Sequence, residues 1–341
     1  MSISHLFHSS DAFIQQTEGG KRIVANKSNF PILQGMSFYR LILNPHAVRE
    51  PHWHANADEL GYCLQGQILI SIYDTNNVKK TFMVNQGEAF LIPSGALHSI
   101  ENASNEISDL ILQFSHEQPE DFAISSTLSL FTDAVLGNTW NKNSAYFKQL
   151  TRVTQETLIT LRKGTLTYSQ DVFYDSPNRF KLDATPPLIK TEGGSAKLAR
   201  KSVWPALRNQ AIYSLKLTGQ GMREPHWHPE TAELGFVHKG KGRMSILSPD
   251  GSIDTYEMNE GDIYFIPKAY PHHIENLTTN PLHLLIFFDQ VMPGDIGFTA
   301  SLKAFSNEIL ASSLNSSEAF FENLPLYYED LFIVDKLNPL D

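Results

Sequence analysis

Two sets of histidine and glutamate residues could do chemistry in this 341-residue chain. Each set has three histidines and one glutamate in the same spacing, and the sets lie 174 residues apart. Three imidazole nitrogens and one carboxylate oxygen can hold a divalent metal ion and leave positions open for a substrate. The candidate metal ligands are His52, His54, Glu59 and His98 in the first set and His226, His228, Glu233 and His272 in the second.

The repeat extends well beyond these ligands. Residues 17–20 match residues 191–194, and the same offset joins Pro119 to Pro293 and Phe131 to Phe305. A repeat of about 120 residues indicates two copies of one domain, because solenoid repeats have periods of roughly 20–50 residues. We therefore expect a first domain at 1–162 with a helical appendage, a connecting segment at 163–190, and a second domain at 191–341 with a helical tail.

The elements that must position the ligands read as short strands separated by turns, which favours a sandwich or a barrel. His52 and His54 are two residues apart on such a strand, so their side chains point to the same face. Glu59 follows on the next strand and His98 on a later one, which places all four ligands inside a small barrel. Helix-like spacing is confined to residues 128–136 and 146–162 after the first copy, and to 302–310, 316–323 and 327–335 after the second.

The composition of the chain indicates which kinds of partner and which cellular compartment we expect for the protein. A formal net charge of −10 and scattered basic residues argue against a nucleic-acid-binding protein. There is no run of 18 or more apolar residues, so we expect no membrane span. Cys63 is the only cysteine, and the first residues show no secretory signal, so we expect a cytoplasmic protein.

The two motifs of each copy resemble those of the cupin superfamily. These motifs are Gly-x5-His-x-His-x4-Glu-x6-Gly and Gly-x5-Pro-x-Gly-x2-His-x3-Asn, and the chain departs from them where His46 and Ala269 replace glycines. The resemblance covers most of residues 17–136 and 191–310. It implies an all-β chain of two tandem cupin domains, each a jelly-roll or double-stranded β-helix barrel, with short flanking α-helices.

Within the cupins, the chain is most similar to the oxalate decarboxylase group of bicupins. The string Arg-Glu-x-His-Trp-His at 49–54 and 223–228 carries this similarity. The resemblance implies one manganese ion per domain, a homo-oligomer (a trimer or a hexamer), and an arginine that grips a small carboxylate. Arg49 and Arg223 take that role, because a guanidinium can bind a carboxylate through two parallel hydrogen bonds. The alternative is a structural ion pair with Glu50 or Glu224.

One part of the family pattern is missing. Decarboxylases of this group carry a lid that reads Ser-Glu-Asn-Ser-Thr, whereas residues 119–127 read Pro-Glu-Asp-Phe-Ala-Ile-Ser-Ser-Thr. Asp121 or Glu120 could serve as the general acid. Alternatively, they cap the helix that starts nearby. This acidic segment favours the first copy as the catalytic one.

The resemblance implies a manganese-dependent carboxy-lyase that converts oxalate to formate and carbon dioxide. The ligand types also suit iron, nickel or zinc. Two alternatives stay open: an iron- or manganese-dependent dioxygenase or isomerase with a larger substrate, and a non-catalytic bicupin that binds a metal or ligand. Oxygen consumption would separate the dioxygenase from the decarboxylase.

Overall fold

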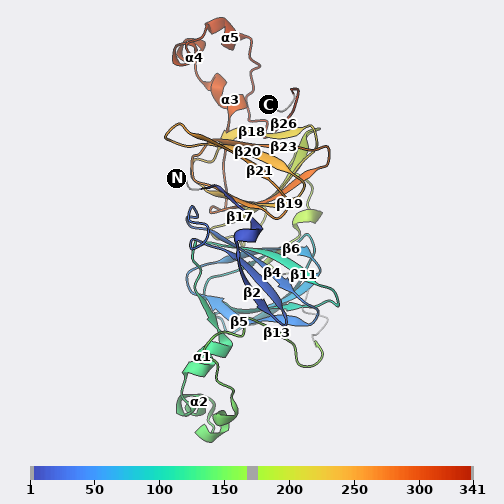
Figure 1. Ribbon diagram of the computed structural model, residues 1–341, viewed down its shortest axis with the longest axis vertical. Coiled ribbons are helices and arrows are strands. Elements are labelled where there is room, and N and C mark those ends of the chain that lie inside the picture. Colours follow the sequence, from blue (N-terminus) through green and yellow to red (C-terminus); the bar gives the residue numbers. More distant parts are fainter. Residues whose placement is uncertain (1–3, 167–175, 339–341) are drawn as a thin grey trace. The chain divides into compact units, whose positions relative to one another are not determined.

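The computed structural model of the chain describes residues 4–166 and 176–338. These residues form two compact units, and in each of them two antiparallel sheets enclose an apolar core (Figure 1). One unit comprises Ala12–Lys181, and the other combines Met1–Asp11 with Leu182–Asp341. The all-β architecture expected from the sequence is confirmed.

The boundaries of these units differ from the expected ones at both ends of the first domain. Strand β1 (Leu6–Phe7) pairs with β22 (Ile263–Ile266), so the N-terminal segment belongs to the second unit. Strand β14 (Arg179–Phe180) pairs with β9 (Ala89–Ile92), so the end of the connecting segment belongs to the first. Each short strand covers a sheet edge, which the repeat pattern does not reveal. Residues 167–175 of the expected connecting segment lie outside the described residues.

The first unit has one sheet in the order β14-β9-β6-β11-β4-β3-β2 and another in the order β12-β5-β10-β7-β8, with β13 also paired to β5. Buried side chains from both sheets, such as Leu41, Phe82 and Phe114, fill the space between them. The remaining strands are β2 (Phe13–Thr17), β3 (Gly20–Ala25), β4 (Ser37–Leu43), β5 (Ala47–His54), β6 (Glu59–Gln65), β7 (Gln67–Tyr73), β8 (Lys79–Asn85), β10 (Leu97–Asn102), β11 (Ser108–Phe114), β12 (Asp121–Ala123) and β13 (Ile159–Leu161).

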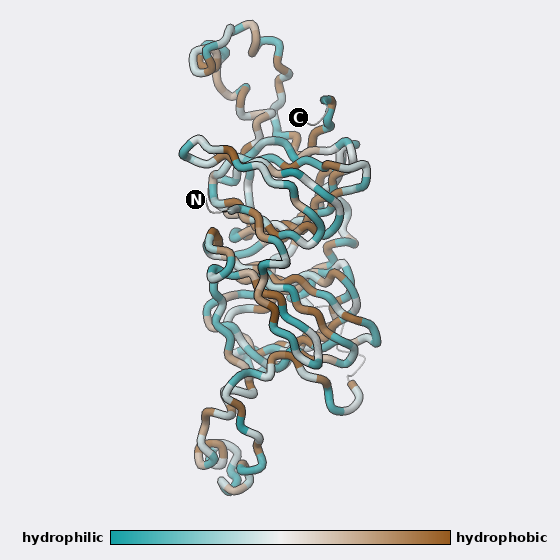
Figure 2. Tube along the Cα trace, viewed as in Figure 1, coloured by the Kyte–Doolittle hydropathy of each residue, from teal (hydrophilic) through white to brown (hydrophobic). Residues whose placement is uncertain are grey.

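The second unit repeats this plan with the orders β1-β22-β19-β24-β17-β16-β15 and β21-β20-β23-β18-β25, and β26 pairs with β18. Hydrophobic residues gather on the strands of each unit (Figure 2). The remaining strands are β15 (Ile189–Lys190), β16 (Gly194–Ala199), β17 (Ala211–Leu217), β18 (Gly221–Trp227), β19 (Glu233–Lys239), β20 (Gly242–Leu247), β21 (Ile253–Met258), β23 (His272–Asn276), β24 (Leu282–Phe288), β25 (Ile296–Gly297) and β26 (Ile333–Asp335).

Short helices follow each pair of sheets, and Figure 1 shows α1 and α2 set apart from the sheets of their own unit. None of the helices described is long and apolar enough to cross a membrane. The helical elements are η1 (Ser9–Asp11), α1 (Ile124–Leu130), α2 (Asp133–Trp140), η2 (Ser144–Gln149), η4 (Leu182–Ala184), α3 (Phe298–Ser301), η5 (Leu302–Ala304), α4 (Asn307–Leu314) and α5 (Glu318–Glu322).

Two expected helices are wrong. The segment 146–162 forms η2 and then strand β13, and the segment 327–335 ends in strand β26. Leu158 precedes β13 and Phe332 precedes β26. Each has a φ of 65°, a left-handed conformation that cannot continue an α-helix. Each strand then pairs with β5 or β18, the strand that carries the paired histidines.

Candidate metal centres

Three strands of each unit bring the predicted ligands together. His98 on β10 lies opposite His52 on β5 in the ladder, and Glu59 begins β6. The second unit repeats this arrangement, with His272 on β23 opposite His226 on β18. In each set the four ligand atoms lie within 4.8 Å of one another, and all four residues are buried. The structure therefore gathers both sets of ligands into compact clusters.

A β-bulge brings the arginine to the same side as the histidines. Arg49 and His52 are three residues apart, so regular strand alternation would send them to opposite faces. The ladder between β5 and β10 shifts register there, because Ile100 lies opposite Arg49 while His98 lies opposite His52. The extra residue is next to Pro51, which has no backbone N–H to donate. Arg49 and His52 are consequently both buried.

Hydrogen bonds fix the orientation of the imidazole rings. Nδ1 of His52 contacts the carbonyl of Glu50 at 2.7 Å, and Nδ1 of His98 contacts the carbonyl of Ala96 at 2.9 Å. The second unit has the same contacts from His226 to Glu224 O at 2.8 Å and from His272 to Tyr270 O at 2.9 Å. A carbonyl can only accept, so Nδ1 carries the hydrogen and Nε2 presents its lone pair to the cluster.

The inner atoms of the clusters fit a metal ion. Nε2 of His98, Nε2 of His272 and Oε1 of Glu59 are buried without a hydrogen-bond partner among the described residues. Buried polar atoms are normally paired, so each of these needs an explanation. A divalent cation would satisfy them, and three neutral nitrogens with one carboxylate oxygen are a suitable donor set for manganese, iron, nickel or zinc.

The electrostatics of His52 and Glu59 in the first cluster favour binding of a cation. Burial, reinforced by Arg49, lowers the pKa of His52 well below its usual value, so this imidazole is neutral. Burial alone would raise the pKa of Glu59, but the neighbouring imidazoles of His54 and His98 lower it to about 2. A neutral imidazole and an ionised carboxylate are the protonation states that bind metal.

The arginine of the first unit does not pair with its neighbour in the sequence. Nη2 of Arg49 lies 3.3 Å from Oδ2 of Asp121, and Nη1 lies 3.1 Å from Oε2 of Glu156. The carboxylate of Glu50 instead accepts hydrogen bonds from the backbone N–H groups of Ser125 and Leu158. Glu50 thereby anchors the segment before β13 beside the metal cluster.

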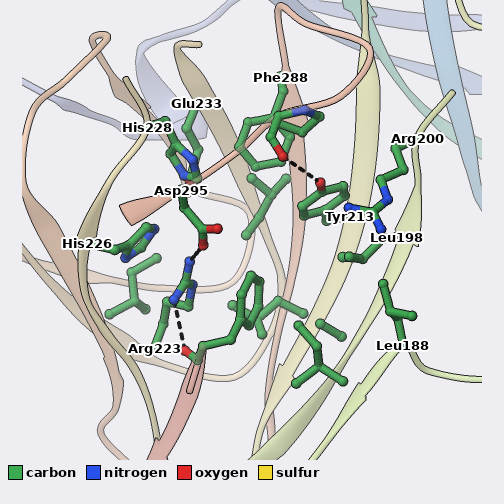
Figure 3. Close-up of a pocket in the computed structure, with 17 residues that line it drawn as sticks. Leu188, Leu198, Arg200, Tyr213, Arg223, His226, His228, Glu233, Phe288 and Asp295 are labelled. Carbon is green, nitrogen blue, oxygen red and sulfur yellow. Dashed lines mark hydrogen bonds and ion pairs between the residues drawn. The ribbon is translucent and has the colours of Figure 1, made fainter. Parts of the chain in front are cut away.

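The arginine of the second unit, Arg223, forms an ion pair with Asp295, and Figure 3 shows Asp295 lying between Arg223 and His228. Nη1 of Arg223 donates to the carbonyl of Phe332 at 2.9 Å, and its guanidinium carbon lies 3.6 Å from the centroid of the Phe332 ring. The carboxylate of Glu224 accepts hydrogen bonds from Thr299 and from the backbone of Phe332.

Asp121 contacts the metal cluster through a histidine. Its Oδ1 lies 2.6 Å from Nδ1 of His54, and its Oδ2 lies 2.7 Å from Nη1 of Arg22. Burial alone would raise the pKa of Asp121, but His54 and the two arginines lower it below its ordinary range. Glu120 is exposed. Helix α1 has Ala123 at its N-cap and no capping side chain, so neither acid caps it.

The second cluster opens into a cavity of about 150 Å³ within the second unit (Figure 3). Arg223, His226, His228, Glu233 and Asp295 lie at one side. The rest of the wall is mainly apolar and includes Leu188, Ile189, Ala196, Leu198, Leu215, Phe288 and Phe332. The cavity thus joins a metal-binding cluster and a guanidinium to an apolar wall.

Several residues around the clusters escaped the sequence analysis. Glu156 and Phe332 lie in segments interpreted as helical tails, although the offset between the copies continues there and pairs Glu156 with Asp330. Extending the repeat to residue 336 would have found them. Tyr264 donates to Oε1 of Glu233 at 2.7 Å, and Arg22 enters the first cluster from β3. Both lie on ordinary strands, and no sequence signal marks them.

Comparison with known proteins agrees with this geometry. The profile of the family described as Cupin matches residues 4–145 and 180–320. The chain belongs to the cupin family. This cupin is similar to oxalate decarboxylase OxdC of Bacillus subtilis (strain 168), with 25% identity over 328 residues that cover 93% of the chain and 84% of the relative.

A second sequence relative and a solved structure are also similar to this chain. A probable oxalate decarboxylase of Arthroderma benhamiae is 24% identical to this cupin over 277 residues, which cover 79% of the chain and 68% of the relative. The structure of oxalate decarboxylase from Bacillus subtilis at pH 4.6 superposes with a TM-score of 0.86 and 24% identity, and covers 98% of this chain and 88% of that one. The two-domain cupin fold is therefore shared over almost the whole chain.

Proposed function

We propose that this cupin is a manganese-dependent oxalate decarboxylase that converts hydrogen oxalate to formate and carbon dioxide. The observation that carries the proposal is the pair of buried clusters of three histidines and one glutamate, each with an arginine on its inner face. Similarity to oxalate decarboxylases over 93% of the chain supports the substrate. The Bacillus subtilis enzyme has Mn(II) centres, which supports manganese over iron, nickel or zinc.

The residues of each centre have distinct roles in this proposal. The eight predicted ligands hold the two metal ions, and a bound divalent ion would act as a Lewis acid on the substrate carboxylate. Arg49 or Arg223 binds the carboxylate through parallel hydrogen bonds. The apolar walls keep water away from the reacting carbon, which strengthens these electrostatic contacts.

The proton that formate needs does not have to come from Asp121 or Glu120, the two acids that the sequence suggests as donors. Asp121 is held ionised by its partners, and Glu120 is exposed. We therefore propose that Asp121 is a positioning residue for His54. Hydrogen oxalate itself carries the one proton that formate needs, so the reaction balances without a donor from residues 119–127.

The proposal is tested by a product assay on manganese-loaded protein. Oxalate is supplied at mildly acidic pH, and formate, carbon dioxide and dissolved oxygen are followed together. Equal amounts of formate and carbon dioxide without net oxygen loss are expected. No formate from protein with both centres loaded would contradict the proposal and would favour a non-catalytic binding protein.

The apolar wall of the cavity favours a second candidate function. Leu188, Leu198, Leu215 and Phe288 would make few contacts with an anion as small as oxalate. A carboxylate with a hydrocarbon body would pack its apolar surface against these side chains, and burial of apolar surface contributes roughly 25 cal/mol per Å². An iron- or manganese-dependent dioxygenase or isomerase would use such a substrate, and net oxygen consumption would identify the dioxygenase.

We also propose that the protein is a cytoplasmic homo-oligomer, either a trimer or a hexamer. The helical segments expose large apolar side chains that an interface would cover, including Leu130, Trp140, Phe305 and Ile309. Cys63 is buried and unpaired, which fits a reducing compartment. Light scattering on the purified protein is expected to give three or six chains per particle, and a monomer would contradict the proposal.

A further inference from the structure

The two centres differ at one inward-facing position on equivalent strands. Arg22 on β3 corresponds to Ala196 on β16, and both are buried. The neighbouring positions are alike in charge, since Arg49 corresponds to Arg223 and Asp121 to Asp295. An arginine therefore enters the first centre at the place where the second centre has a methyl group.

The additional arginine closes an ion-pair cluster in the first centre. Nη1 of Arg22 lies 2.7 Å from Oδ2 of Asp121, and its Nη2 lies 3.3 Å from Oε1 of Glu156. Arg49 contacts the same two carboxylates. Nε of Arg22 also donates to Oε1 of Gln15 at 2.7 Å. Two guanidinium groups thus share two carboxylates immediately beside the metal ligands.

Asp121 and Glu156 occupy Nη2 and Nη1 of Arg49, so a substrate carboxylate would have to compete with them for this guanidinium. The displaced carboxylate would lose one of its two cations in a partly buried position, which is unfavourable. Displacement of Asp121 would also release His54, because Asp121 bridges Arg49 and Nδ1 of His54. Substrate binding that displaces Asp121 would therefore disrupt the support of a metal ligand.

The second centre has the corresponding space. Ala196 lies in the wall of the 150 Å³ cavity that reaches Arg223, His226 and His228. One water molecule needs roughly 10–15 Å³ by this measure, so the cavity can hold an anion of the size of oxalate. Among the residues drawn in Figure 3, Asp295 is the carboxylate paired with the guanidinium of Arg223, whereas Arg49 contacts two carboxylates.

We propose that the second centre binds the substrate carboxylate, beside Arg223, and that Arg22 closes the first centre to substrate. The identity of the substrate rests on the proposed function, whereas the choice of centre rests on the exchange of Ala196 for Arg22. This assigns substrate binding to the copy without the acidic segment, opposite to the sequence-based expectation. The first centre then holds a metal ion behind a closed ion-pair cluster.

The test installs the arginine of the first centre in the second. Full-length Ala196→Arg is loaded with manganese, its metal content is measured, and oxalate is added without oxygen while the Mn(II) resonance is recorded. In the wild type, oxalate is expected to change the signal of one manganese per chain. In Ala196→Arg this change should require at least tenfold more oxalate. Ser195→Arg, which adds the same charge at a half-buried position outside the cavity lining, is the matched control and should respond like the wild type.

A second variant keeps the proposal falsifiable if Ala196→Arg does not fold. His272→Ala removes a ligand of the second metal, so the remaining manganese reports the first centre alone. Its signal should not change with oxalate, and a change would overturn the proposal. An unaltered response of Ala196→Arg would also overturn it.

Formate measured in the same samples separates the two claims. Oxalate binding at the second centre without formate would contradict the proposed reaction and leave the choice of centre standing. Binding and formate that persist in His272→Ala would overturn the choice of centre alone. No response at either loaded centre would contradict both.

Discussion

At the level of single residues, the support of the equivalent ligands His54 and His228 differs. Nδ1 of His54 contacts the carboxylate of Asp121, whereas Nδ1 of His228 lies 3.0 Å from the carbonyl of Gly294. The two carboxylates around His54 raise its pKa to about 9, although burial alone would lower it. A carboxylate partner makes an imidazole a stronger donor to a metal than a carbonyl does.

Replacement of Asp121 should therefore weaken only the first centre. Asp121→Asn is expected to lower the manganese affinity of this centre by about 10- to 100-fold, because loss of a partner of a metal-bound histidine has effects of this size. Manganese titration followed by calorimetry would measure it. Asp295→Asn is the matched control, since the Nδ1 partner of His228 is the Gly294 carbonyl. Intact metal affinity with lost turnover would instead identify Asp121 as a proton donor.

Tyr264 supports the carboxylate ligand of the second centre, and its counterpart in the first is Phe90. The phenol donates to Oε1 of Glu233, while Oε1 of Glu59 has no hydrogen-bond partner among the described residues. Gly235 makes room for the phenol, because a Cβ there would lie 2.0 Å from its ring.

Tyr264→Phe should destabilise the metal-free second unit by about 1–3 kcal/mol, the usual effect of removing a buried hydrogen bond to a charged group. Urea unfolding of the metal-free protein would measure the change. Phe265→Leu, at the adjacent position outside the cluster, controls for loss of packing. A Tyr264→Phe protein with the stability of the wild type would contradict the assigned role.

At the level of elements, the strand pattern predicted most of the site. The spacing of His52 and His54 was enough to predict that both side chains point into the site, because alternate residues on a strand share a face. The position of Arg49 was not predictable in this way, because it depends on the bulge at Pro51. The strands β13 and β26 were missed because they are three residues long and follow left-handed residues, which leaves no periodic pattern to detect.

One side-chain contact between neighbouring strands of the second unit predicts that the free energy of unfolding depends on pH. His283 on β24 contacts Ser214 on β17 at 2.8 Å, whereas the equivalent positions in the first unit form the ion pair of Asp109 with Arg40. Burial, with Lys216 and His238 nearby, lowers the pKa of His283 to about 3, against about 6.5 for an exposed histidine.

Between these two values the unfolded chain binds more protons than the folded chain. The free energy of unfolding contributed by His283 should therefore fall as the pH falls from about 6.5 towards 3, and should be constant above that range. Urea unfolding at pH 7 and at pH 5 would show the loss. In the variant His283→Gln, which keeps a hydrogen-bonding group near Ser214, the loss of unfolding free energy between pH 7 and pH 5 should be smaller. An equal loss in the variant would show that His283 does not cause the pH dependence.

At the level of the whole molecule, length and repeat predicted two domains of one fold. The sequence could not show that the N-terminal strand β1 joins the second unit and that β14 joins the first, because a two-residue strand carries no pattern. The difference between the centres was also hidden, since Arg22 and Ala196 lie outside the cupin motifs.

The central claim is that each repeat builds its own complete metal centre. The most direct test is the ratio of manganese to protein after saturation and removal of excess metal. We predict two ions per chain in the wild type and one in each of the variants His98→Ala and His272→Ala. A wild-type chain that binds fewer than two ions, or a single substitution that removes both, would contradict the account.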